Sequence, residues 1–96
     1  MDIVFGLFVW NALKEQENAA KHGVHFIAAS KAFEDPNIKI FVDSKHSEQE
    51  ERFFAIGKVE EGILTVRFTY RGGEIRILGA GYWRNGRRLY ERKKGP

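Results

Sequence analysis

The sequence predicts an α+β fold in which two N-terminal helices pack on one face of an antiparallel sheet of four to five strands, followed by a short C-terminal helix. The apolar residues have a helical spacing before Pro36 and a period of two after it. Glycine-containing turns at residues 60–62 and 71–73 then join three apolar segments into an antiparallel meander. A length of 96 residues, with 43% apolar residues and no cysteine, predicts one domain (residues 1–96) whose core needs no disulfides.

The first expected element is an apolar strand over residues 2–10. A helix follows through His22, because the side-chain oxygen of Asn11 accepts a free backbone N–H of the first turn. Gly23 supplies the left-handed stop after it. The apolar residues of this segment recur at spacings of seven and four: Leu13, Ala20 and Val24.

A second helix is expected over residues 26–33. It ends at Asp35, because a residue that precedes proline disfavours the helical region. Residues 38–42 then alternate in the manner of a half-buried strand, and the polar segment 43–51 is typical of an exposed loop.

The meander strands are expected at residues 52–59, 63–70 and 74–81. In the middle strand the predicted core face consists of Leu64, Val66, Phe68 and Tyr70. The other sheet face is expected to be partly open and to carry Arg67, Thr69, Glu74 and Arg76. Asn85 is the predicted cap of the final short helix, which Gly86 weakens by roughly 1 kcal/mol relative to alanine.

The charge of the chain is unevenly distributed. Residues 1–70 hold 8 Lys and Arg against 11 Asp and Glu, whereas residues 71–96 hold 8 against 2. Such a basic block favours a polyanionic partner, either a nucleic acid or an acidic protein, although a solvated basic tail has the same composition.

Several site classes are not expected from this sequence. His22 and His25 straddle Gly23 and do not share a helical face, and without cysteine no metal site is predicted. The Gly79-Ala80-Gly81 segment is too short for a dinucleotide fingerprint, so no cofactor is expected either. No apolar run approaches the roughly 18 residues of a membrane span, and no membrane association is predicted.

Cations and aromatic rings are interleaved toward the C-terminus: Tyr70-Arg71, Arg76, Tyr82-Trp83-Arg84, Arg87-Arg88 and Tyr90. Guanidinium groups hold phosphate oxygens and aromatic faces stack on unpaired bases, so the mixture favours RNA or single strands. The same rings are also typical of half-buried packing residues beneath arginine stems. Metal-independent RNA cleavage additionally needs a base and an acid, for which the residues that qualify are Lys21, His22, His46, Glu48, Glu50, Glu51 and Tyr70.

Two segments carry a resemblance to a known family. The first spans residues 8–26 and ends Lys21-His22-Gly23-Val24-His25-Phe26, with Ala-Phe-Glu-Asp-Pro following at residues 32–36. The second is His46-Ser47-Glu48-Gln49-Glu50-Glu51-Arg52-Phe53, with Ile56-Gly57, Arg71 and Arg76-Ile77 behind it. In this order and spacing the chain resembles the BrnT family of toxins over nearly its whole length.

The resemblance implies a type II toxin with a fold related to the RelE-like ribonucleases. It further implies that the protein cuts RNA, inhibits translation and is neutralised by a BrnA-type antitoxin. Operator DNA would be bound only through the antitoxin complex. The expected location is the bacterial cytoplasm.

The family match assigns candidate roles to Lys21, His22, Glu51, Arg52, Arg71 and Arg76. We expect Arg71, Arg76 and Arg84 to hold phosphate and His22, Glu51 or Tyr82 to transfer protons. The further RNA-binding candidates are Lys21, Arg52, Arg67, Trp83, Arg87 and Arg88.

One position departs from the family pattern. Many relatives end the last strand with Ile-Ser-Ala-Arg, whereas this chain has Leu78-Gly79-Ala80-Gly81 and places Arg84 as a proposed replacement for the missing arginine. The alternative is therefore a catalytically silent module that binds an antitoxin or nucleic acid and acts in regulation.

Overall fold

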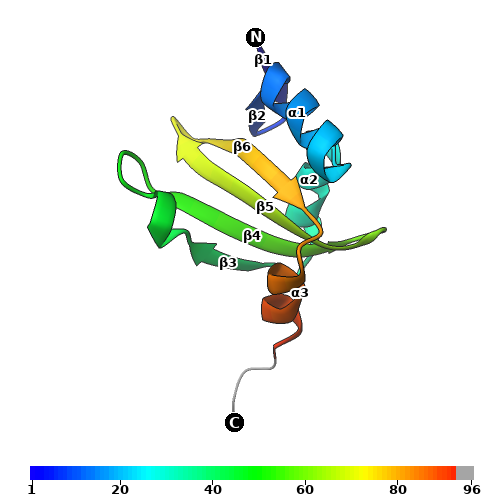
Figure 1. The fold of residues 1–96 in the computed structure, drawn as a ribbon. Coiled ribbons are helices and arrows are strands. Elements are labelled where there is room, and N and C mark those ends of the chain that lie inside the picture. Colours follow the sequence, from blue (N-terminus) through cyan, green and yellow to red (C-terminus); the bar gives the residue numbers. More distant parts are fainter. Residues whose placement is uncertain (93–96) are drawn as a thin grey trace.

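A computed structural model describes residues 1–92 as three α-helices and a six-stranded sheet (Figure 1). The sheet order is β1-β2-β6-β5-β4-β3, with the following bounds: β1 Asp2–Phe5, β2 Phe8–Asn11, β3 Lys39–Val42, β4 Arg52–Val59, β5 Gly62–Arg71 and β6 Glu74–Gly81. Strands β3 to β6 form the predicted meander. Lys93 and Lys94 of the basic block lie outside the described residues.

The N-terminal segment differs from the predicted single strand. Gly6 has a φ of 61° at a tight turn, so residues 2–10 form the β1–β2 hairpin instead. Strand β2 then pairs in parallel with β6, through Phe8 opposite Ile75 and Val9 opposite Arg76. The sheet is therefore mixed and six-stranded, and the expectation of an antiparallel sheet with four to five strands is wrong in both respects.

The first two helices follow the sequence signals. Helix α1 (Ala12–His22) begins at Asn11, whose Oδ1 accepts a hydrogen bond of 3.0 Å from the Lys14 N–H. It ends at Gly23, which has a φ of 70°. Helix α2 (Phe26–Lys31) continues as the 3₁₀ turn η1 (Ala32–Glu34). In the core, α2 and η1 bury Phe26, Ala29 and Ala32 against the sheet.

The predicted apolar stripe is confirmed only at Val24, which is buried; within α1 it is wrong, because Leu13 is 62% exposed and Ala20 is exposed. The buried residue of the helix is Asn18. Its Nδ2 donates to the carbonyl oxygens of Val24 (2.9 Å) and Ala80 (3.0 Å), and its Oδ1 accepts from the Ala80 N–H (3.1 Å). A polar side chain thus joins α1 to the end of β6.

Helix α3 (Arg84–Glu91) packs on the sheet face that the sequence predicts to be partly open. Gly86 is buried against Thr65 of β5, and a Cβ at this position would collide with the threonine hydroxyl. The glycine that weakens the helix is therefore the one that permits its close packing. The predicted cap is wrong: the residue before the helix is Trp83, whose carbonyl accepts from the Arg87 N–H (3.1 Å), and Asn85 lies within the first turn.

The far end of α3 is fixed to the start of β3. The Tyr90 hydroxyl donates to Asp35 Oδ2, and Lys39 Nζ donates to the Leu89 carbonyl oxygen (3.1 Å). Burial alone would raise the pKa of Asp35, but bonds from the Tyr90 hydroxyl and from two backbone N–H groups lower it below its ordinary value.

The side chains of strand β5 alternate between the two faces of the sheet. Leu64, Val66 and Phe68 are buried in the core as predicted, whereas Tyr70 is 53% exposed. The opposite face of the strand carries Thr65, Arg67 and Thr69. No helix among residues 1–92 is long and apolar enough to cross a membrane.

Candidate functional site

Three arginines project from adjacent strands on the sheet face that carries α3. Arg52 of β4 and Arg76 of β6 both lie opposite Thr69 of the central β5 strand. Arg67 lies two residues before Thr69 on the same strand. Residues at such positions are direct or diagonal cross-strand neighbours, so their guanidinium groups share one surface. We call Arg52, Arg67 and Arg76 the arginine face. All three side chains are half-buried.

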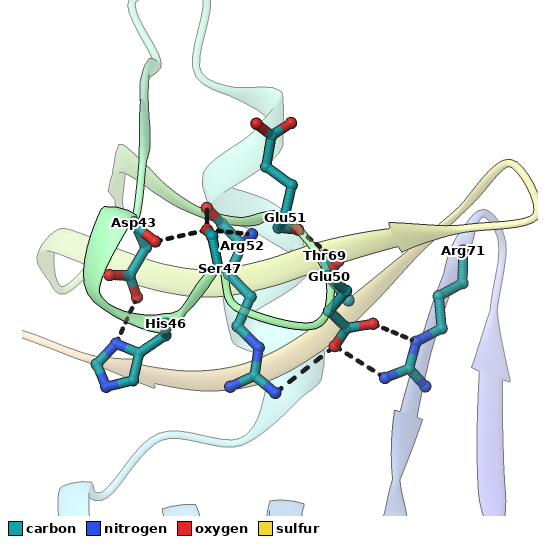
Figure 2. Close-up of polar contacts among 8 residues, drawn as sticks. All are labelled: Asp43, His46, Ser47, Glu50, Glu51, Arg52, Thr69 and Arg71. Atoms are coloured by element: carbon teal, nitrogen blue, oxygen red, sulfur yellow. Dashed lines mark hydrogen bonds and ion pairs between the residues drawn. The ribbon is translucent and has the colours of Figure 1, made fainter.

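Carboxylates hold the outer arginines of this surface. Glu50 accepts two bonds of 2.9 Å from Arg71 Nε and Nη2 at the end of β5, and lies 3.6 Å from Arg52 Nη2 (Figure 2). The bonds from Arg71 lower the pKa of the Glu50 carboxyl below its ordinary value. Asp2 likewise accepts a 2.6 Å bond from Arg76, which lowers the pKa of Asp2.

Two hydrogen-bond donors of the arginine face nevertheless have no acceptor within residues 1–92. Arg52 Nε and Arg76 Nε are buried and meet no acceptor among the described residues. These two atoms are out of reach of solvent, so an incoming anion would meet the part of each side chain that stays exposed, 33% for Arg52 and 18% for Arg76. The face is therefore suited to binding an oxyanion such as phosphate.

A structured turn precedes β4. The 3₁₀ turn η2 (Ser44–His46) places His46 Nδ1 2.9 Å from Asp43 Oδ2, and Asp43 is only 4% exposed. His46, Glu50 and Arg52 line one pocket of about 300 Å³ together with Lys45, Glu48 and Gln49. The segment that the sequence predicts as a plain loop therefore has fixed side chains.

A second cleft, of about 260 Å³, lies between α1 and β6. Its lining includes Lys21, His22, Arg67 and Trp83, so the structure brings together four residues that the sequence predicts for the site. The His22 and Trp83 rings meet edge to face, with centroids 5.2 Å apart. Arg67 lines this cleft and also the neighbouring pocket under α3.

Trp83 accounts for the glycine at position 81, where the resemblance to the family predicts an arginine. A Cβ on Gly81 would lie 2.5 Å from Cε2 of the Trp83 indole, so the indole occupies the space of a side chain at position 81. Beside it, a Cβ on Gly79 would lie 3.9 Å from Arg67 Nε. The arginine that borders this strand end therefore comes from β5, not from β6.

We expect Gly81→Arg to displace the indole and lower the free energy of unfolding by about 1–3 kcal/mol, as overpacking does. With Trp83→Ala the space is vacated, so the double variant should lose less than the sum of the two single losses. Urea unfolding of the four proteins measures this coupling. Additive losses would show that the two side chains do not compete for the same space.

Other predicted site residues lie apart from these pockets. The Glu51 carbonyl accepts from the Thr69 hydroxyl (2.7 Å), while its carboxylate points away from His46 and the Arg52 guanidinium (Figure 2). Tyr82 lies beside Gly62 in the β4–β5 hairpin, where burial and the nearby Glu61 raise the pKa of its phenol. The predicted arginines of α3 are exposed: Arg84, Arg87 and Arg88. Arg87 contacts Glu91 of its own helix (3.4 Å). The roles of these residues stay predictions.

No sequence motif assigns a role to Asp43, and His46 is one of seven residues that qualify as base or acid from sequence alone. Asp43 and His46 are three residues apart in the sequence. This spacing indicates a contact only when the segment between them is known to form a turn. Among residues 1–92, no group of three or more His, Asp or Glu residues is arranged to hold a metal ion.

Comparison with known proteins agrees with the motifs. Residues 10–86 match the family described as ribonuclease toxin, BrnT, of type II toxin-antitoxin system. This range contains the α1–β6 cleft, the η2 turn and the arginine face. Comparison with curated proteins found no match. Because the family match spans most of the sequence, the chain belongs to the BrnT family of ribonuclease toxins of type II toxin–antitoxin systems.

Proposed function

We propose that this protein is an endoribonuclease toxin that cleaves RNA by metal-independent transesterification and thereby inhibits translation, on a fold related to the RelE-like ribonucleases. The single observation that carries the proposal is the arginine face, three half-buried guanidinium groups on one surface, in a member of a ribonuclease family. The site of action is the bacterial cytoplasm.

The reaction needs proton transfer and fixed positive charge. A base removes the proton of a ribose 2′-hydroxyl, the 2′-oxygen attacks the adjacent phosphorus, and the bond to the 5′-oxygen breaks. An acid protonates the departing 5′-oxygen, which leaves a 2′,3′-cyclic phosphate and a 5′-hydroxyl end. Guanidinium groups that are already in place stabilise the crowded phosphate of the transition state more than the ground state.

Side chains of both clefts have roles in this proposal. The arginine face, made of Arg52, Arg67 and Arg76, holds the reacting phosphate together with Arg71. Lys21 and the Trp83 indole border the α1–β6 cleft, where a cation and an aromatic face suit a flanking nucleotide. The predicted partner is a BrnA-type antitoxin. Its carboxylates would compete with phosphate for donors that Glu50 and Asp2 already contact.

Purified protein is expected to degrade RNA in the presence of EDTA, and Arg71→Ala is expected to slow cleavage by about 10- to 100-fold. This loss is smaller than the 10²- to 10³-fold typical of a preorganised donor, because Arg71 is half exposed and must first leave Glu50. Arg92→Ala is the matched control, since Arg92 is exposed and lies outside both pockets. Intact RNA at high protein excess would refute the nuclease.

The glycine at position 81 favours a second candidate, a catalytically silent module that binds the antitoxin, or operator DNA through the antitoxin complex. Induction of the gene in a bacterial host, with and without the neighbouring reading frame, separates the two. Growth arrest that the neighbour relieves supports the toxin. Stable association with the neighbour's product without growth arrest supports the silent module.

A further inference from the structure

His46 is held as an oriented imidazole. Its Nδ1 lies 2.9 Å from Oδ2 of Asp43, a carboxylate that is almost fully buried. Among the described residues, the other ring nitrogen, Nε2, forms no hydrogen bond. An imidazole that donates from one nitrogen to a buried carboxylate presents the other nitrogen as a proton acceptor.

Backbone and hydroxyl contacts fix the carboxylate in turn. The Asp43 N–H donates to the Arg52 carbonyl oxygen (2.7 Å), which ties the turn to the first residue of β4. Ser47 Oγ donates to the Asp43 carbonyl oxygen (2.6 Å) and accepts from the Arg52 N–H (3.0 Å). The pair is therefore built into the sheet edge, as a preorganised catalytic group must be.

The imidazole and the Arg52 guanidinium point toward the same side of the turn (Figure 2) and line the same pocket. A phosphate bound at Arg52 would bring its neighbouring ribose hydroxyl to this pocket. The pocket thus combines a proton acceptor with a phosphate-binding cation, the two groups that transesterification requires.

The other candidate bases are less suitable. Glu50 accepts two bonds from Arg71, which lower the pKa of its carboxyl and weaken it as a base. The Glu51 carboxylate points away from this pocket (Figure 2). His22 packs edge to face on Trp83, and no carboxylate among residues 1–92 orients its ring.

We propose that His46, positioned by Asp43, is the catalytic residue that takes the 2′-hydroxyl proton, an assignment that rests on the proposed ribonuclease function. The proton moves to Nε2 as the 2′-oxygen attacks phosphorus and the bond to the 5′-oxygen breaks. The resulting imidazolium stays paired with the Asp43 carboxylate. A water or a second protein acid protonates the 5′-oxygen.

The three histidines of the chain allow a matched test. His46→Ala is expected to lower kcat for RNA cleavage by about 10²-fold or more, as loss of general base catalysis does, with little change in RNA affinity. Added imidazole should restore part of the activity, an effect that a purely structural histidine would not show. His25→Ala, on an exposed residue outside both pockets, is the control.

The His22→Ala variant tests the competing assignment, in which His22 is the base. Full activity of His46→Ala together with loss of activity in His22→Ala would overturn the assignment to His46 and leave the nuclease standing. Wild-type protein that leaves RNA intact would overturn both. Because His46→Ala leaves a buried carboxylate unpaired, the variant Asp43→Asn/His46→Ala is assayed beside it, and imidazole should rescue this protein as well.

Discussion

Replacing Arg67 with alanine is expected to slow RNA cleavage by about 10²- to 10³-fold, the largest loss among the arginine substitutions. Arg67 projects from the central strand β5 and lines both the α1–β6 cleft and the pocket under α3. It lies beside Gly79, near the end of β6, where the resemblance to the family predicts an arginine at position 81.

The charge of Arg67 is also the most available on the arginine face. Within residues 1–92, Arg67 takes part in no ion pair, whereas Arg52 shares Glu50 with Arg71 and Arg76 is bound to Asp2. A substrate phosphate need not displace a carboxylate to reach it. Its truncation should therefore cost more activity than truncation of Arg71.

Cleavage rates of Arg67→Ala, Arg67→Lys and Arg92→Ala, together with their thermal melting, test this expectation. Lysine keeps the charge but loses the planar fork, so Arg67→Lys should fall between the alanine variant and wild type. Arg92→Ala should cleave like wild type. If Arg67→Ala retains more activity than Arg71→Ala, Arg67 does not supply the main phosphate contact.

The Asn18→Leu variant is expected to lose at least about 3 kcal/mol of unfolding free energy, because three buried backbone groups would lose their partner at about 1–3 kcal/mol each. These groups are the N–H and carbonyl of Ala80 and the carbonyl of Val24. Such a loss is a large part of the roughly 5–15 kcal/mol that stabilises a typical domain. Because Asn18 also lines the α1–β6 cleft, the variant should bind RNA weakly.

Asn11→Ala is the matched control for Asn18→Leu. It removes an exposed helix cap with one side-chain bond and should cost only about 1 kcal/mol. Guanidinium unfolding followed by circular dichroism compares the two. Equal losses would mean that the buried amide contributes no more than a surface cap.

Local signals predicted the elements whose causes are local. The cap at Asn11 and the stop at Gly23 predicted α1 correctly. The period-two pattern predicted β4 and β6 with their observed bounds. The placement of Arg67 and Arg76 on the face opposite the core also followed from alternation. Each depends on residues close together in the sequence.

The remaining features depend on contacts between distant segments. The parallel pairing of β2 with β6 joins residues more than sixty positions apart, and no local pattern encodes it. The burial of Asn18 is not encoded by its neighbours in sequence, because its partners, Val24 and Ala80, are fixed only by the tertiary fold. Gly86 likewise weakens a helix by propensity and gains its role only from contact with Thr65.

The parallel β2–β6 pair has a consequence for how the protein is made. The β1–β2 hairpin is synthesised first, but its partner strand β6 is among the last elements of the described chain. Domains fold as units while synthesis proceeds, and long-range pairing must await the later segment. Arg76 and its contact with Asp2 thus complete the arginine face only once β6 has emerged. The nascent polypeptide is without the complete arginine face while most of it is being translated.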